Sequence, residues 1–262
     1  MGADLVSDLA KFDGTLREWL GSAPYTLGMS SGYFGFFAHS GVLHALLDAG
    51  LAPAAVSGSS AGSLVGGCYA SGTPIDGLVA RFLALKRGDF WDPGIGAGLL
   101  KGDLFRGLLQ ELTSVARVEA CPTRLTVSLF DVARRQTVVI SEGDLPATIL
   151  ASCALPFLFH PVRIEGRLYS DGGILDRPGL AGVAVGERVL HHHLSSKSPW
   201  RRKDSPALHP PSGPELVALV HDGLPRSGPN KLDMGRRAYD EAKQRTGRAL
   251  GMRASAVVRS KS

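Results

Sequence analysis

The sequence is poor in the features that mark specialised classes of protein. Only three of its 262 residues are cysteines, at positions 68, 121 and 153. Their spacing matches no metal-binding motif, and an odd number of cysteines does not form a complete set of disulfides. A reducing compartment is therefore expected. Apolar runs reach only about ten residues, whereas a membrane-spanning helix needs about 20. The N-terminus has no secretory signal pattern. We therefore predict a cytoplasmic protein that meets membranes peripherally, if at all.

The composition excludes disordered, collagen-like and coiled-coil chains. Charged residues make up 20% and hydrophobic residues 44%, close to the average of globular proteins. A chain of this length suits one large domain or two small ones, and one large domain can bury a full core. Glycine is abundant, with 33 residues that follow no period. This abundance predicts many tight turns.

The charge is spread unevenly. Residues 231–262 carry a net charge of +6, whereas the rest of the chain carries −1. A basic helix is predicted at about 231–250, and its partner could be an anionic membrane or a nucleic acid. A solvated basic helix is the simpler alternative. Nucleic acid is disfavoured, because the only basic–aromatic pairing, Trp200 beside residues 201–203, falls in a proline-rich predicted mobile loop at about 195–213.

Short apolar strands alternate with helical patterns along the first 75 residues. Strands are predicted at 25–30 and 54–57, and helices at 39–47 and 63–71, which favours a parallel sheet with helices on both faces. The other predicted elements are helices at 4–20, 74–87, 103–113 and 145–154, strands at 125–132, 136–141, 162–164, 167–170 and 188–194, and a helical or loop segment at 215–224. The fold class predicted is α/β, with a mostly parallel central sheet and one domain over 1–262.

A candidate nucleophile stands between the second strand and its helix. Gly58-Ser59-Ser60-Ala61-Gly62 matches the G-x-S-x-G pattern of a nucleophile elbow, whose sharp turn presents the central serine above the sheet. Ser60 would then lie at a helix N-terminus, where amides and the helix dipole favour negative charge. The alternative is an ordinary glycine-rich turn.

A serine nucleophile needs a base, and two kinds of candidate exist. Asp171 follows a short strand and opens an Asp171-Gly172-Gly173 turn, where glycines allow a close approach to Ser60. A plain Asp-Gly hairpin turn is the alternative for this motif. The late histidines offer a Ser-His-Asp esterase with His192 or His221, although the run His191–His193 fits packing in a strand better.

Four motifs in the right order resemble the patatin-like phospholipase family over about residues 25–178. They are Gly32-Tyr33-Phe34-Gly35 with His39-Ser40-Gly41-Val42-Leu43, the elbow at Ser60, Ala151-Ser152-Cys153-Ala154-Leu155-Pro156, and Asp171-Gly172-Gly173. The resemblance implies a three-layer α/β/α fold and a serine lipid acyl hydrolase with a Ser60–Asp171 dyad. It implies an acyl-enzyme, lipid or acyl-ester substrates, and neither metal nor organic cofactor.

The oxyanion loop departs from the family pattern of three glycines, a variable residue, Arg or Lys, and glycine. Ser31 takes the first glycine position, and no Arg or Lys lies between Gly32 and His39. An oxyanion hole could still form from the amides of Gly32, Tyr33, Phe34 and Ala61. Losing one such donor typically lowers the rate about a hundred- to a thousandfold. A catalytically weak lipid-binding protein is therefore a further alternative.

Overall fold

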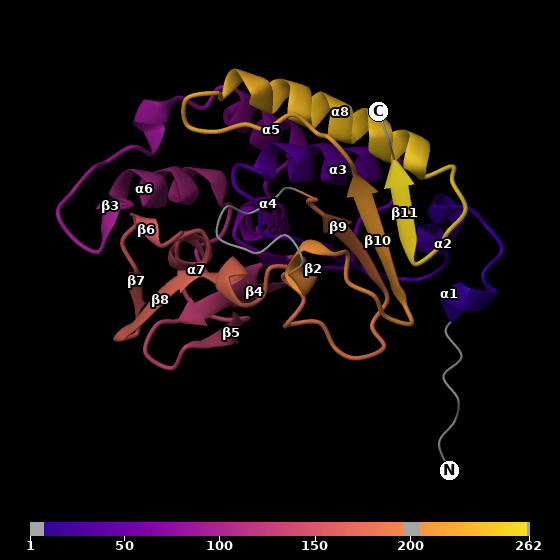
Figure 1. Ribbon diagram of the computed structural model, residues 1–262, viewed down its shortest axis with the longest axis horizontal. Coiled ribbons are helices and arrows are strands. Elements are labelled where there is room, and N and C mark those ends of the chain that lie inside the picture. The colour runs from indigo at the N-terminus through magenta and orange to yellow at the C-terminus, as the bar shows by residue number, and fades with distance from the viewer. Residues whose placement is uncertain (1–7, 196–204, 261–262) are drawn as a thin grey trace, which may run out of the picture.

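The computed structural model describes residues 8–195 and 205–260, over which a nine-stranded sheet forms the centre of the molecule (Figure 1). Its strands run in the order β11-β10-β9-β1-β2-β4-β8-β7, and β5 pairs with β4. All pairs from β11 to β4 are parallel, and the pairs made by β5, β7 and β8 are antiparallel. The predicted α/β class with a mostly parallel sheet is confirmed.

The strands of this sheet are β1 Thr26–Met29, β2 Ala55–Ser59, β4 Arg124–Asp131, β5 Gln136–Ile140, β7 Val162–Ile164, β8 Arg167–Asp171, β9 Val189–His193, β10 Leu216–His221 and β11 Val257–Ser260. A separate pair joins β3 Gly98–Leu100 to β6 Phe157–Phe159. The helices are α1 Asp8–Lys11, α2 Leu16–Ser22, α3 Phe36–Asp48, α4 Ala61–Ala70, α5 Ile75–Leu83, α6 Asp103–Leu112, α7 Leu145–Ser152 and α8 Asp233–Ala249.

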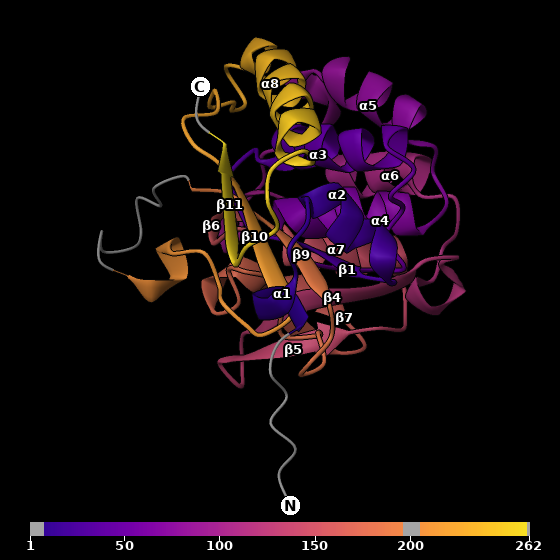
Figure 2. The ribbon, with the colours of Figure 1, turned by 90° about the vertical axis from the view of Figure 1, so that its right-hand side faces the viewer.

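Helix α4 packs directly on one face of the central strands. The approach is close enough that a Cβ atom added to Gly66 would lie 2.6 Å from Val56 of β2. Helices α3, α5 and α8 stack outward on the same side (Figure 2). The opposite face of the middle strands is covered by the segment 179–183, where Leu180 approaches Gly28 of β1. Strands β1, β2, β9 and β10 are buried throughout, as expected for parallel strands covered on both faces.

Two predicted elements differ from the structure. The helix expected at 4–20 is divided into α1 and α2, because Thr15 begins a new helix with a capping box in which it accepts from the Glu18 amide. Residues 4–7 lie outside the described residues. The helical or loop segment expected at 215–224 is strand β10, which is buried between β9 and β11.

The basic segment is built into the fold. Helix α8 confirms the helix predicted at 231–250, and it crosses α3 so closely that a Cβ at Gly41 would lie 2.4 Å from the Tyr239 carbonyl oxygen. Strand β11 then pairs with β10 at one edge of the sheet. Removing this segment would therefore expose core, so its role has to be tested with point substitutions.

Candidate active site

The candidate nucleophile stands on a strained turn between β2 and α4. Ser60 has a φ of 52° and a ψ of −119°, which is rare for a residue with a side chain and typical of functional turns. A Cβ at Gly58 would lie 2.7 Å from the Gly62 backbone, and one at Gly62 would lie 2.1 Å from the Met29 oxygen. The two glycines predicted for the elbow are therefore required by the backbone's close approach to itself and to β1.

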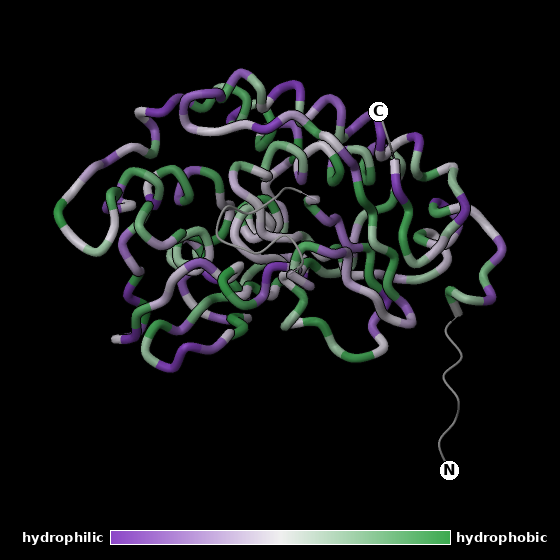
Figure 3. The backbone as a smooth tube through the Cα atoms, viewed as in Figure 1, coloured by the Kyte–Doolittle hydropathy of each residue, from purple (hydrophilic) through white to green (hydrophobic). Residues whose placement is uncertain are grey.

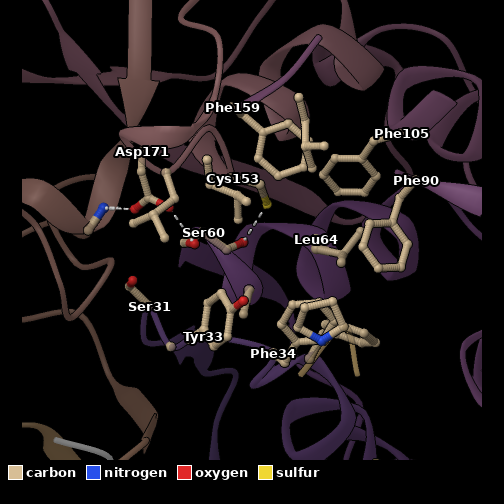
Figure 4. Close-up of a pocket in the computed structure, with 18 of the residues that line it drawn as sticks. Ser31, Tyr33, Phe34, Ser60, Leu64, Phe90, Phe105, Cys153, Phe159 and Asp171 are labelled. Carbon is tan, nitrogen blue, oxygen red and sulfur yellow. Dashed lines mark hydrogen bonds between the residues drawn. The ribbon is translucent and has the colours of Figure 1, made fainter. Parts of the chain in front are cut away.

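Asp171 is the last residue of β8 and lies beside Ser60, which follows β2. Strand β4 lies between these two strands. The Ser60 hydroxyl donates a hydrogen bond of 2.7 Å to Oδ2 of Asp171, as Figure 4 shows. Oδ1 of Asp171 accepts from the Gly173 amide at 2.8 Å. Asp171 as a whole is only 3% exposed. A Cβ at Gly172 would lie 2.0 Å from the Ser128 oxygen, so the first glycine after the aspartate lets this turn pack against β4.

Helix α7 holds the backbone of Ser60 from its C-terminal end. The Ser60 amide donates to Oγ of Ser152 at 2.9 Å, and this hydroxyl donates to the Ser128 oxygen at 2.9 Å. The Cys153 thiol donates to the Ser60 carbonyl oxygen at 3.2 Å. Burial, with the nearby charge of Asp171, raises the pKa of this thiol, so it stays protonated. The sequence marked 151–156 as one of the family's motifs but assigned no role to Ser152 or Cys153.

The predicted oxyanion residues lie in the wall of the pocket that contains Ser60 and Asp171. Gly32, Tyr33, Phe34 and Ala61 all line it. The Ser31 amide donates to the Arg177 oxygen at 2.7 Å and is therefore occupied. In the two stretches 8–195 and 205–260, nothing accepts a hydrogen bond from the amides of Gly32, Tyr33 or Phe34.

This pocket has a volume of about 890 Å³, within the range of small-molecule sites. Its wall is mainly apolar and aromatic, and Figure 4 shows this wall extending away from Ser60. The apolar lining residues include Phe34, Phe36, Leu64, Phe82, Leu85, Phe90, Trp91, Leu100, Phe105, Leu108, Leu155, Phe157 and Phe159. The lining also contains the polar and charged residues Ser31, Ser60, Asp171, Arg177, Arg226 and Ser227.

A separate buried cluster contains His39, His191, His192, His193 and His221. Nδ1 of His39 lies 2.8 Å from Nδ1 of His192, and Nε2 of His221 lies 2.9 Å from the Thr246 hydroxyl. None of these three histidines lines the pocket. Burial lowers the pKa of His39 to about 4. The alternative triad with His192 or His221 is therefore not assembled around Ser60 in this structure.

The described residues contain neither a metal-binding cluster nor a membrane-spanning helix. Within 8–195 and 205–260, no three His, Cys, Asp or Glu side chains gather so that they could hold a metal ion. Over the same ranges, no helix has both the length and the hydropathy needed to cross a bilayer.

Residues 27–183 match the family model of the patatin-like phospholipases, which is more than half of the chain. The chain belongs to the patatin-like phospholipase family. The match agrees with the extent of the motifs found in the sequence, and it includes the elbow at Ser60 and the turn at Asp171.

Relatives by sequence are longer proteins. An uncharacterized NTE family protein of Mycobacterium bovis is 32% identical over 162 residues, which is 60% of this chain and 45% of that protein. Two Mycobacterium tuberculosis strains have counterparts with the same values. Lysophospholipase nte1 of Emericella nidulans is 26% identical over 147 residues, 53% of this chain and 10% of the enzyme. The chain thus spans less than half of these relatives.

Solved structures share the fold at low sequence identity. VipD from Legionella pneumophila superposes with a TM-score of 0.57 and 16% identity, covering 80% of this chain and 52% of that one. The type III effector protein ExoU gives a TM-score of 0.51 and 14% identity, covering 87% and 52%. At this level of identity, the similarity supports the fold.

Proposed function

We propose that the protein is a serine hydrolase that cleaves fatty-acyl esters of phospholipids or other lipids, with Ser60 as nucleophile and Asp171 as base. The observation that carries this proposal is the 2.7 Å hydrogen bond between their side chains in the wall of an apolar pocket. A hydroxyl becomes a useful nucleophile when an adjacent base can take its proton. Membership of the patatin-like phospholipase family supports the reaction class.

The reaction would proceed in two halves. Asp171 accepts the proton of Ser60 while Oγ attacks the ester carbonyl carbon, and the tetrahedral intermediate collapses to an acyl-enzyme. The alcohol or lysolipid leaves with the proton from Asp171. Water then gives a proton to Asp171 and attacks the acyl carbonyl, and the fatty acid is released as the proton returns to Ser60. The Gly173 amide keeps Oδ1 oriented, so that Oδ2 faces the hydroxyl throughout.

The oxyanion would be stabilised by backbone amides from two elements. Ala61 supplies the amide at the start of α4, and the loop Gly32–Phe34 supplies amides that the described residues leave without acceptors. Oriented amides in a water-poor pocket stabilise a developing oxyanion strongly, because no reorganisation is needed. The role assigned to Gly32, Tyr33, Phe34 and Ala61 rests on this placement.

The pocket wall indicates the substrate class. Its apolar and aromatic lining suits a flexible hydrocarbon chain, whose burial gives roughly 0.8 kcal/mol per methylene. A polar leaving group would remain near the mouth. The substrate is therefore an ester with at least one long acyl chain.

Peripheral contact with an anionic membrane through the basic segment 231–262 belongs to the same proposal. Internal ion pairs use four of its cations, Lys243, Arg245, Arg253 and Arg259. The exposed Arg236 and Arg237 on α8 have no carboxylate partner in the described part of the chain. Each exposed cation near an anionic surface contributes about 1 kcal/mol to binding.

The second candidate is a lipid-binding protein without turnover, which the occupied Ser31 amide favours. Labelling with a fluorophosphonate separates the two functions, because the reagent bonds covalently only to an activated serine. The wild type and Ser59→Ala should be labelled and should hydrolyse p-nitrophenyl esters, since the Ser59 hydroxyl has no hydrogen-bond partner among the described residues. Ser60→Ala should do neither. An unlabelled, inactive wild type that still binds lipid would refute the hydrolase proposal.

A further inference from the structure

Exposed apolar side chains gather at the mouth of the pocket. Tyr33 is 58% exposed and Phe157 is 77% exposed, and both also line the cavity. Leu175, which is 54% exposed, follows the lining residue Ile174. Water-facing aromatics that continue into an apolar cavity differ from the single exposed apolar residues found on most protein surfaces.

The loop before β3 extends this apolar rim. Ile95 is fully exposed and Leu99 is 48% exposed, and their segment is joined to β6 through the pairing of Gly98 with Phe157. Figure 3 shows this loop projecting at the edge of the molecule, with apolar colour at its tip. Phe157 has a φ of 67°, a strained backbone for an aromatic residue, and it still presents its ring to solvent.

Basic side chains occupy an adjacent part of the rim. Arg226 lines the pocket, and Arg87 stacks at 3.8 Å on the ring of Trp91, which lines it too. Nη1 of Arg87 donates to Oδ1 of Asn230 at 3.2 Å, and the exposed Lys231 follows. The same loop reaches Tyr33, since a Cβ at Gly228 would lie 3.9 Å from the tyrosine ring. The basic and apolar parts are therefore continuous.

The three acids of residues 87–103 are already engaged. Asp89 pairs with Arg81 at 2.9 Å, and Asp103 pairs with Lys101 at 3.4 Å. The Asp92 carboxylate accepts from the amides of Gly102 and Leu104, each at 3.1 Å. No carboxylate in the described ranges pairs with Arg87, Arg226 or Lys231. The rim thus presents uncompensated positive charge beside apolar groups.

We infer that this rim is a docking surface for a phospholipid bilayer that contains anionic lipid. Tyr33, Ile95, Leu99 and Phe157 enter the boundary between headgroups and acyl chains, and Arg87, Arg226 and Lys231 meet lipid phosphates. The mixture of apolar and basic groups matches the bilayer interface, where burial and charge act together. Because the rim continues into the pocket, an acyl chain could pass to Ser60 without crossing water. The inference adds a docking site to the proposed hydrolase.

The parent protein for the docking experiment is Ser60→Ala, so that docking is measured without turnover. Its binding is measured by co-sedimentation with vesicles of phosphatidylcholine, with and without phosphatidylglycerol. We expect Ile95→Asp to lower binding about tenfold or more, because the group that should enter the bilayer becomes charged. Its matched control is Val185→Asp. Val185 is 104% exposed against 105% for Ile95, and it lies in the loop that leads into the amino end of β9, whereas Ser60 follows the carboxyl end of β2 in the same parallel part of the sheet. This control should bind like the parent.

Substitutions that remove charge distinguish binding through the rim from binding through the exposed Arg236 and Arg237 of α8. Arg87→Gln and Lys231→Gln should each lower binding to phosphatidylglycerol vesicles about fivefold and leave binding to pure phosphatidylcholine unchanged. If only Arg236→Gln with Arg237→Gln lowered binding, docking would belong to α8 and the rim would be refuted. Equal losses in Ile95→Asp and Val185→Asp would also refute it. Fluorophosphonate labelling of Ile95→Asp with Ser60 intact tests the proposed hydrolase independently, and we expect it to be unchanged.

Discussion

The Ser60 hydroxyl and the Asp171 carboxylate are 2.7 Å apart in space and 111 residues apart in the chain. The contact forms because the carboxyl end of β2 delivers one partner and the end of β8 delivers the other, with β4 between them. Each partner is held by its own backbone contacts, Ser60 through Ser152 and Asp171 through Gly173. The geometry of the proposed dyad is therefore set by the sheet before any substrate arrives.

Asp171→Asn should abolish turnover and keep the fold. The asparagine oxygen can still accept from the Gly173 amide, but an amide cannot take the proton of Ser60. We expect kcat/KM for a p-nitrophenyl ester to fall about a thousandfold or more, as losses within catalytic units do. The thermal midpoint should stay close to that of the wild type. A folded Asp171→Asn variant with wild-type kinetics would exclude the carboxylate as base.

Ser152→Ala should slow the chemical step through the position of Ser60. Its hydroxyl is the acceptor for the Ser60 amide and donates to the Ser128 oxygen, so its removal leaves a buried N–H unsatisfied. Such a loss costs about 1–3 kcal/mol. We expect lower kcat, little change in KM and a lower free energy of unfolding.

The matched control for Ser152→Ala is Thr148→Val, one turn earlier on α7. The Thr148 hydroxyl is buried and has no hydrogen-bond partner within 8–195 and 205–260, so an isosteric valine removes no bond there. Its kcat and stability should equal or slightly exceed those of the wild type. Equal kcat losses in the two variants would show that α7 packing, and not the Ser60 contact, sets the rate.

A pair of glycine substitutions tests the elbow's packing. A Cβ at Gly62 would lie 2.1 Å from the Met29 oxygen, whereas a Cβ at Gly77 on α5 would meet no atom within 4 Å. Gly62→Ala should therefore lower the free energy of unfolding or prevent folding. Gly77→Ala should raise it by about 0.5–1 kcal/mol, because alanine is the better residue inside a helix. Urea unfolding of both variants measures the difference, and equal stabilities would contradict the close packing.

Local sequence was enough to predict the elbow and the Asp-Gly-Gly turn. Both depend on short strands followed by small residues, and these patterns act within a few positions. Strand β10 could not be predicted in the same way, because its run Leu216–Val220 suits a buried helix as well as a buried strand. Pairing with β9 and β11 decides the outcome, and these partners are distant in the chain.

The hydrogen bonds that hold the Ser60 backbone could not be predicted from the sequence either. Ser152 is one of many serines, and only the packing of α7 against β4 brings its hydroxyl to the Ser60 amide. The docking rim is similar, since Ile95, Phe157 and Lys231 belong to three separate segments. Phe157 lines the pocket, and the segments of Ile95 and Lys231 reach the rim only through the Gly98–Phe157 pairing and the Arg87–Asn230 hydrogen bond of the tertiary structure.

The buried histidine cluster should make stability depend on pH. Nε2 of His39 donates to the Ser30 oxygen, so Nδ1 of His39 accepts from Nδ1 of His192. A second proton on His39 would set two donors against each other. Burial lowers the pKa of His39, His193 and His221 to about 4 and that of His191 to about 3. For His221 the nearby Arg245 adds to this effect.

Because these folded-state pKa values lie below the usual 6.5, the unfolded chain binds more protons between about pH 4 and pH 6.5. The contribution of the neutral buried histidines to the free energy of unfolding is fully present above pH 6.5. It is lost as the pH falls toward 4, by up to about 1.4 kcal/mol per pH unit for each histidine. Urea unfolding at several pH values should show this slope. His221→Gln should reduce it, since an amide can still donate to Thr246 but does not titrate. His209→Gln, at an exposed histidine, is the control. A slope that His221→Gln leaves unchanged would exclude His221 from the effect.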